Sequence, residues 1–510
     1  MRPSCYPLAL ALIASLLLGA PSALAQQTSP APSPRAAMIA GVPALASAGN
    51  PGPLAAFGER AFVIAVGKDD KSSVLPVAVG ATWDKGRVVA LGHGGMISDR
   101  ALEHAGTRAF VHSATVWLGG SPKASVGVFK NEAMVKLLNE AGLSATPLNG
   151  KWHESLAGFA AVVVDSHSIG PAERAALAEY ITRGGGLLTA GLGWGWLQLN
   201  PGKTIQDHPG NLLLVDAGIA WCDGTLDPTG NGEFLIGEVA PALHAASAMN
   251  ELETAARDRA ELSAQASKTL ISALRVLPPQ HPLTLRAAAL LETGGDQLAP
   301  SQGKPLKAKD GVARVLLSMQ VELEKRTPPE KVKPHPGAAS FPGGVPADAR
   351  RVTKELELDL SIPQWHSTGL YAAPGEVITV TVADPRGASV RIGCHTDHLW
   401  HHDRWSRVPD ISREWRLTKG ETRVASAFGG LVYIDVPDNR EGTARFTIAG
   451  AVESPRYVLG VTTADEWRSS REAPGPWGEI ESRSVIISVP SSALRTLESP
   501  DRLIEFWDQI

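Results

Sequence analysis

The stretch from residue 365 to 382 constrains the fold most, because its second half alternates between two faces. It opens with aromatic and small residues, turns at Pro374-Gly375, and continues in β-branched residues. A period of two after a Pro-Gly turn is typical of a half-buried strand. We therefore expect the first strand of a β-sandwich here. Its two faces are Val377, Thr379 and Thr381 on one side and Ile378, Val380 and Val382 on the other.

The region 350–510 continues this β pattern. Short apolar runs are separated by Pro, Gly, Asp and Asn, which is the spacing of a sandwich. The runs that we expect to be strands are 377–382, 390–392, 431–436, 444–448, 457–461 and 485–489.

The region 41–240 has a different pattern, in which strands alternate with helices. Asn131 and Pro171 are placed as the first residues of two helices. This alternation predicts an α/β domain with a parallel sheet of the flavodoxin kind. The runs that we expect to be strands are 61–66, 87–91, 125–129, 159–164 and 187–190.

Three further segments separate or precede these domains. Residues 241–330 are rich in Ala, Leu, Glu and Arg at helical spacing, which predicts a helical spacer. Residues 331–349 are dense in Pro, Lys and Gly, and we expect a linker. Residues 26–40 are rich in Pro, Ser and Ala, and we expect a disordered or polyproline-like linker.

Residues 1–25 have the pattern of a secretory signal peptide. Arg2 precedes a short apolar run, and Ala23-Leu24-Ala25 is a small-x-small cleavage site before Gln26. We expect a secreted or periplasmic protein with no transmembrane segment after signal cleavage, since the run is too short to span a bilayer. The net charge of −4 and the pI near 6.4 disfavour nucleic acid as a partner.

Two motifs that could carry catalysis are incomplete. His153-Glu154 begins as a zincin helix does, but Ala157 stands where H-E-x-x-H needs its second histidine. Gly191-Leu192-Gly193 follows a strand where a class I amidotransferase-like domain would carry its nucleophile, yet Leu192 has no nucleophilic group. We therefore predict an inert relative of that fold and no catalytic residue. Cys222 and Cys394 are expected to be buried thiols.

The segment 394–403 is the densest set of metal-ligand types in the chain. Imidazoles and carboxylates at this spacing could bind zinc or copper, or could form a polar loop after a strand. The candidate ligands are His395, Asp397, His398, His401, His402 and Asp403.

Tryptophan is abundant, with 13 residues, and several lie in the β region. An exposed indole can stack on a sugar ring, although most such residues are expected in the core. Trp400 and Trp405 are the candidates for binding a glycan.

Several strings resemble the enhancin-like zinc metallopeptidases (peptidase family M60), which cut mucin-type glycoproteins. The strings are Ser367-Thr368-Gly369-Leu370-Tyr371, Ile392-Gly393-Cys394-His395-Thr396-Asp397, Gly429-Gly430-Leu431-Val432-Tyr433-Ile434, Ala473-Pro474-Gly475-Pro476-Trp477-Gly478-Glu479-Ile480, Val489-Pro490-Ser491 and Phe506-Trp507-Asp508. Upstream, Gly86-Arg87-Val88-Val89 leading to Gly92-His93 is similar to the TRP-channel-associated factors, with Gly94 in place of a Glu.

The resemblance implies a fold, a substrate and a cofactor. The family's catalytic H-E-x-x-H helix lies downstream of the Trp-Asp segment, toward a zincin domain that this sequence does not contain. We expect the exported, non-catalytic N-terminal portion of a longer peptidase acting on glycoproteins, with zinc in the full-length protein and no cofactor in this chain. The alternatives are a secreted protein that binds a glycan or surface partner, and a metal-binding protein built on 395–403.

Overall fold

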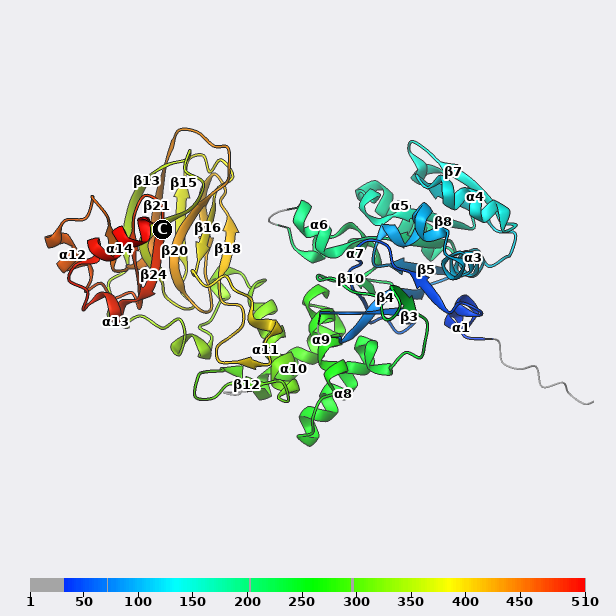
Figure 1. Cartoon of the computed structure of the whole chain (residues 1–510), viewed down its shortest axis with the longest axis horizontal. Helices are drawn as coiled ribbons and strands as arrows, with labels where there is room; N and C mark the ends of the chain where they lie inside the picture. Colours follow the sequence, from blue (N-terminus) through cyan, green and yellow to red (C-terminus); the bar gives the residue numbers. More distant parts are fainter. Residues whose placement is uncertain (1–31, 71, 201–202, 295–297, 510) are drawn as a thin grey trace, which may run out of the picture.

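The computed structural model describes residues 32–509 except 71, 201–202 and 295–297. An α/β lobe and a β-rich lobe lie at opposite ends of the molecule, and a group of helices lies between them (Figure 1). The expected signal peptide, residues 1–25, lies outside the described residues. Within the described part of the chain, no helix is long and apolar enough to cross a membrane.

The α/β lobe is built on one seven-stranded sheet. Its first two strands are antiparallel to their neighbours, and the other five are parallel. In spatial order the strands are β3 (Ala61–Lys68), β4 (Val74–Trp83), β5 (Gly86–Leu91), β9 (Gly186–Ala190), β8 (Ala161–Asp165), β6 (Ser125–Phe129) and β7 (Ser144–Leu148).

This order departs from the flavodoxin order that we expected. Strands β7, β6, β8 and β9 follow the 2-1-3-4 part of the flavodoxin order. The fifth place belongs to β5, which precedes them all in the chain, and β3 and β4 extend the sheet. The lobe is therefore a mixed α/β sheet. The alternation of strands and helices along the sequence indicates which segments are strands, but not which strands are neighbours in the sheet.

Helices cover both faces of the sheet. One face packs against α3 (Ala105–Gly119) and α4 (Glu132–Glu140). The other packs against α5 (Pro171–Thr182) and α7 (Pro209–Leu214). Alternate residues of the central strands contribute to the two cores, as the two-residue period requires: Val89 and Leu188 to the first, Val88 and Leu187 to the second.

Local signals set the helix starts as predicted. The side chain of Asn131 accepts a hydrogen bond from the backbone N–H of Met134, which caps α4. Pro171 occupies the first turn of α5, where its missing N–H costs nothing.

The predicted linker 26–40 is wrong in its described part. Residues Pro34–Ile39 form helix α1, which Ser33 caps through the N–H of Ala36. Met38 is fully buried in the core beside α3, and Arg35 donates to the carbonyls of Ile64 and Gly237. Burial of Met38 and these long-range hydrogen bonds order a segment whose composition is that of a linker.

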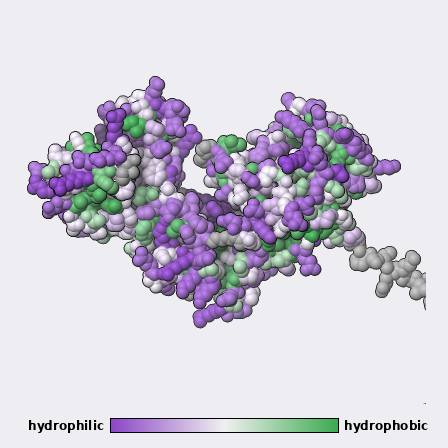
Figure 2. Space-filling view, in the orientation of Figure 1, coloured by the Kyte–Doolittle hydropathy of each residue, from purple (hydrophilic) through white to green (hydrophobic). Residues whose placement is uncertain are grey.

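The helical segment forms one core with parts of both lobes. Its helices are α8 (Ala245–Asp258), α9 (Ala264–Val276), α10 (Pro282–Gly294) and α11 (Gly311–Glu324). Apolar side chains of α9 and α11 pack with Ala55 and Phe57 of the first lobe and with Trp405 and Phe428 of the second. On the face drawn in Figure 2, the surface of this region is mainly hydrophilic.

The predicted linker 331–349 connects the helical segment to the β-rich lobe and packs against that lobe. Pro336–Ala339 form a short 3-10 helix, and His335 and Ala338 are buried. The backbone N–H of His335 donates to the carbonyl of Ala427, and its ring stacks on Phe428 with centroids 4.9 Å apart. The proline content predicts an irregular backbone here, and tertiary contacts hold that backbone against the β-rich lobe.

The β-rich lobe is an eight-stranded sheet that folds into two layers. One layer holds β13 (Val352–Asp359), β21 (Thr443–Glu453), β15 (Ile378–Val382) and β19 (Gly420–Val424). The other holds β14 (Gln364–Ala372), β20 (Gly430–Val436), β16 (Ser389–Ile392) and β18 (Arg413–Arg416). Strand β14 joins the layers by pairing Leu370 with Glu453 of β21. Apolar residues from both layers meet in one core, as in a sandwich.

The alternating stretch 377–382 is a strand, but not the first of the lobe. Ile378, Val380 and Val382 are buried, as the two-face pattern predicts. Strands β13 and β14 precede it. Strand β13 has the pattern of an edge strand with charged residues at alternate positions, and β14 is rich in residues that also suit turns. Their apolar pattern is therefore too weak to predict a strand from sequence.

A small three-stranded sheet and three helices follow the sandwich. The strands are β22 (Arg456–Val458), β23 (Trp477–Glu481) and β24 (Ile486–Pro490), and the helices are α12 (Ala464–Ser470), α13 (Ser491–Leu494) and α14 (Pro500–Asp508). Ile504 anchors α14 in a core with Tyr457 and Trp467.

Candidate functional site

The residues of the segment 394–403 point in different directions. Asp397 forms an ion pair with Arg407 at 2.6 Å, and His398 lies 3.6 Å from the carboxylate of Asp410. His395 is packed between Phe341 and Trp477, with ring centroids 4.7 and 4.6 Å away. Each side chain therefore has a separate local environment.

The end of the segment is held to helix α11. The rings of His401 and His402 lie 4.1 Å apart, and Arg314 donates to the carbonyls of His402 and Asp403. Nowhere in the described parts of the chain do three or more His, Cys, Asp or Glu side chains converge in a way that could hold a metal ion. The structure brings His401 and His402 together but does not assemble the predicted ligand set.

The two candidate tryptophans differ from the expectation of a glycan-stacking surface. Trp405 is fully buried, with the guanidinium of Arg314 3.9 Å from its ring centroid. Trp400 packs edge-on against it at 5.2 Å. The prediction of a sugar-binding role is wrong for Trp405, because a ring enclosed by protein offers no face to a sugar. Trp400 remains partly exposed.

The truncated zincin motif is not on an α-helix. Residues Trp152–Gly158 form a 3-10 helix, in which His153 pairs with Glu173 at 3.2 Å and Glu154 with Lys151 at 3.4 Å. The first pair joins this turn to α5. His153 and Glu154 of the motif therefore each form a local ion pair, which is a structural role.

The carboxyl edge of the parallel sheet gathers imidazoles and a carboxylate. Strands β5 and β8 end just before His93 and at Asp165, and His167 Nδ1 lies 3.1 Å from the carboxylate of Asp165. The ring of His208 lies 5.4 Å from that of His167 and 5.2 Å from that of Trp221. Ligands bind at this edge in open α/β sheets.

His208 is the least ordinary member of this group. It is fully buried, and among the described residues neither ring nitrogen has a hydrogen-bond partner. Burial, helped by the neighbouring His167, lowers the pKa of His208 to about 3. The ring is therefore neutral at physiological pH. Leu192 occupies the elbow position, so the edge offers acid-base groups without the nucleophile that amidotransferase-like chemistry needs.

A buried carboxylic acid joins the sandwich to the small sheet. Glu479 of β23 accepts hydrogen bonds from the hydroxyls of Tyr433, at 2.6 Å, and Ser488, at 3.2 Å, and a further one from Ser367. Burial raises the pKa of Glu479 above its ordinary value, despite these three donors. The three hydroxyl donors come from β14, β20 and β24, so this one side chain fixes β23 and β24 against the sandwich.

The largest cavity that we describe lies between the α/β lobe and the helical segment and has a volume of about 720 Å³. One wall comes from α9 and from the end of α11 and the residues just after it. The other comes from the turns after β3 (Asp69, Asp70) and after β10 (Ile219–Trp221), together with residues 204–206. Pockets of this size bind small ligands in other proteins.

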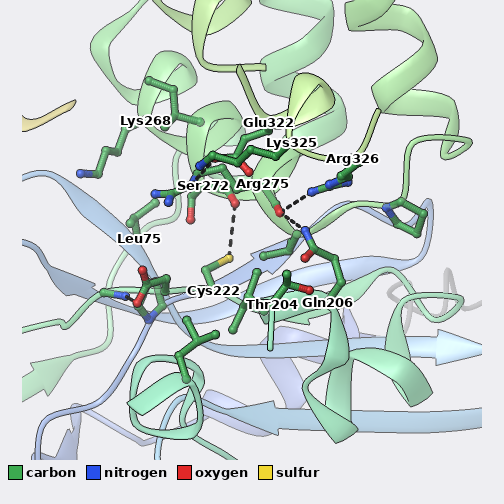
Figure 3. Close-up of a pocket in the computed structure, with 18 of the residues that line it drawn as sticks. Leu75, Thr204, Gln206, Cys222, Lys268, Ser272, Arg275, Glu322, Lys325 and Arg326 are labelled. Atoms are coloured by element: carbon green, nitrogen blue, oxygen red, sulfur yellow. Dashed lines mark hydrogen bonds and ion pairs between the residues drawn. The ribbon is translucent and has the colours of Figure 1, made fainter. Parts of the chain in front are cut away.

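Hydrogen bonds fix the wall of this cavity (Figure 3). Arg326 and Gln206 both donate to the backbone carbonyl of Arg275, and Arg326 also donates to that of Leu277 at 2.6 Å. The thiol of Cys222 points toward the carbonyl of Ser272, 3.7 Å away. Burial raises the pKa of Cys222 to about 12, so the thiol is protonated and is not a nucleophile.

Sequence reasoning did not find this cavity. Its charged residues come from segments as far apart as Asp69 and Arg326. Helical spacing places Lys268 and Arg275 on one face of α9, and Glu322 and Lys325 one turn apart at the end of α11. The available signal was the set of basic residues on the amphipathic helices α9 and α11.

Comparison with known proteins shows family similarity over most of the chain. A model described as the N-terminal domain of M60-like peptidases matches residues 347–449, and one described as peptidase M60, enhancin and enhancin-like, matches residues 450–510. A model of the TCAF N-terminal domain, described as "TRPM8, N-terminal domain", matches residues 33–232. Residues 347–510 thus match the M60-like peptidases, and residues 33–232 match a different domain model. More specifically, the chain carries enhancin-like M60 sequence after a region like that of the TRPM8 channel-associated factors.

Among similar proteins, TRPM8 channel-associated factor 2 of Bos taurus is 30% identical over 484 residues, which cover 91% of this chain and 50% of that protein. The chain thus spans about half the length of this relative. A solved structure of the IMPa metallopeptidase in complex with T-antigen aligns with a TM-score of 0.49 and 16% identity, over 92% of this chain and 59% of that one. IMPa from Pseudomonas aeruginosa in complex with an O-glycopeptide aligns with a TM-score of 0.44 and 15% identity, over 93% and 60%.

Proposed function

We propose that this chain is the exported, non-catalytic part of an enhancin-like zinc metallopeptidase that acts on glycoproteins. The observation that carries the proposal is the pair of adjacent M60 matches over residues 347–510 in a sequence that contains no H-E-x-x-H. Peptide hydrolysis by zinc-activated water needs two histidines one helical turn apart and a glutamate beside the metal. These 510 residues supply none of those ligands.

In this proposal the chain has a structural role: it holds the M60-matching region in a fixed position relative to the rest of the protein. The Glu479 network fixes the small sheet of the M60-matching region to the sandwich, and the buried contacts of α11 fix the sandwich to the helical segment. The amidotransferase-like lobe is inert in this proposal, since Leu192 replaces the nucleophile. Zinc belongs to residues outside this sequence, and the substrate is a glycosylated protein or surface glycan.

Hydrolysis and binding are measured on the same purified protein. The 510-residue chain is incubated with an O-glycosylated mucin and zinc, and the products are separated by electrophoresis. We expect no cleavage, and retention on immobilised mucin that falls after enzymatic removal of the glycans. Cleavage that disappears with a chelator would refute the non-catalytic assignment.

The family assignment and export have their own tests. Sequencing the gene beyond codon 510 is expected to show codons for an H-E-x-x-H motif. A stop codon directly after Ile510 would contradict the peptidase proposal. Sequencing the N-terminus of protein recovered from the periplasm or medium is expected to begin at Gln26. Recovery from the cytoplasm of protein that still begins at Met1 would contradict export.

A further inference from the structure

The cavity between the α/β lobe and the helical segment has two walls of opposite charge. The helical wall carries Lys268, Arg275, Lys325 and Arg326 with one acid, Glu322. The opposite wall carries Asp69, Asp70 and Asp223. The four cations and four carboxylates balance, so the lining as a whole has no net charge, but positive and negative groups are concentrated on different sides.

Most of the cations on the helical wall are already engaged by the protein. Lys325 lies 3.0 Å from Glu322 and 2.7 Å from Asp410, and both terminal nitrogens of Arg326 donate to backbone carbonyls. Lys268 contacts Asp69 at 2.6 Å.

Arg275 is less fully engaged than the other three cations. Its Nε lies 3.5 Å from Glu322, and among the described residues its guanidinium makes no hydrogen bond. A half-buried guanidinium with two unused Nη groups is suited to bind a carboxylate in a bidentate manner.

The opposite wall holds acceptors for a cation. One oxygen of Asp223 accepts the backbone N–H of Gly224 at 2.8 Å, and no hydrogen bond reaches the other oxygen from the part of the chain described. Asp70 is exposed and also lines the cavity. An ammonium group has three donors and needs such carboxylate oxygens.

We propose that this cavity binds a short peptide with free ends, its carboxylate on Arg275 and its ammonium group at Asp223. A simple anion such as phosphate would meet the three aspartates, and an apolar ligand would leave the charged walls desolvated and unpaired. The volume of about 720 Å³ suits a molecule of tetrapeptide size. Thr225 and Gln280 add further polar groups to the lining. This site is independent of the proposed function.

Calorimetric titration of the 510-residue protein with three peptides tests the proposal. The probes are tetra-alanine, its methyl ester and its N-acetyl form. Tetra-alanine is expected to bind, and each blocked form to bind at least about tenfold more weakly, since each loses one charge-assisted contact. Absence of binding by tetra-alanine, or equal affinity of the three peptides, would overturn the proposal.

Two substitutions test which residue contacts each end of the bound peptide. Arg275→Gln is expected to weaken tetra-alanine binding by at least about tenfold and to leave the methyl ester unaffected. Asp223→Asn keeps an oxygen for the N–H of Gly224 and is expected to abolish discrimination against the N-acetyl peptide.

Arg257→Gln is the matched control. Arg257 lies on α8, outside the cavity, and contacts exposed Asp258 at 3.3 Å. It is expected to bind all three peptides like the unaltered protein, and circular dichroism checks that each variant is folded. If Arg257→Gln weakens binding as much as Arg275→Gln does, or if both cavity variants bind like the unaltered protein, the cavity is not the site. The opposite charges would then serve only to dock the two walls.

Discussion

Replacing Arg413 by methionine tests the charge network that ties the helical segment to the sandwich. The side chain of Arg413 is 5% exposed and lies 2.6 Å from Glu324 of α11 and 3.0 Å from Asp410. Glu324 also accepts the backbone N–H of Ala427 at 3.1 Å. One guanidinium thus neutralises two carboxylates at the junction of the two parts.

The magnitude follows from what the substitution leaves behind. Removing one partner of a buried ion pair costs about 3–5 kcal/mol, because the remaining charge stays buried. Lys325 still contacts Asp410 at 2.7 Å, so the second carboxylate keeps a partner. We therefore expect the lower end, about 3 kcal/mol.

Urea unfolding followed by tryptophan fluorescence measures the change, with Arg445→Met as the control. Arg445 pairs with Glu357 at 3.1 Å on the exposed surface, where such a pair contributes at most about 1 kcal/mol. If Arg413→Met destabilises the transition that reports the sandwich no more than Arg445→Met does, the buried network does not stabilise the junction.

The same network predicts a loss of stability in acid. Burial alone would raise the pKa of Asp410, but Arg413 and Lys325 outweigh it and hold the pKa below its ordinary value. A carboxylate with a lowered pKa in the folded state stabilises the fold above its unfolded pKa of about 3.9, and this contribution is lost as the pH falls through the lower folded value.

Three further changes test separate features. Glu479→Gln is expected to flatten the pH dependence of stability, because the raised pKa of Glu479 makes the fold less stable as the pH rises above about 4.3. An unchanged dependence of the urea midpoint on pH would contradict this. His208→Phe is expected to leave stability unchanged or increase it by up to about 2 kcal/mol, because it removes two unpaired buried nitrogens; thermal unfolding that shows a clear loss would indicate a hidden partner for the ring. Cys222 is expected to resist iodoacetamide in the folded protein at pH 8 and to react in urea, as read by mass spectrometry; rapid labelling of the native protein would refute its burial.

Local sequence patterns determined much of this protein. The alternation of Ile378, Val380 and Val382 places a strand and its buried face, and Asn131 and Pro171 start helices wherever the rest of the chain goes. The strings over 365–508 also indicate the enhancin-like family without reference to the fold, and family models match the same region. These signals survive because each depends on residues a few positions apart.

Tertiary structure decided everything that depends on distant residues meeting. It placed β5 beside β9, buried Trp405 under Arg314, kept His395 and His398 in separate environments, and packed the proline-rich segment around His335 against Phe428. It also brought Asp223 and Arg275 into one cavity. The physical reason is that periodicity and composition report which face of an element is apolar, whereas the partner of that face is selected by packing across the whole chain.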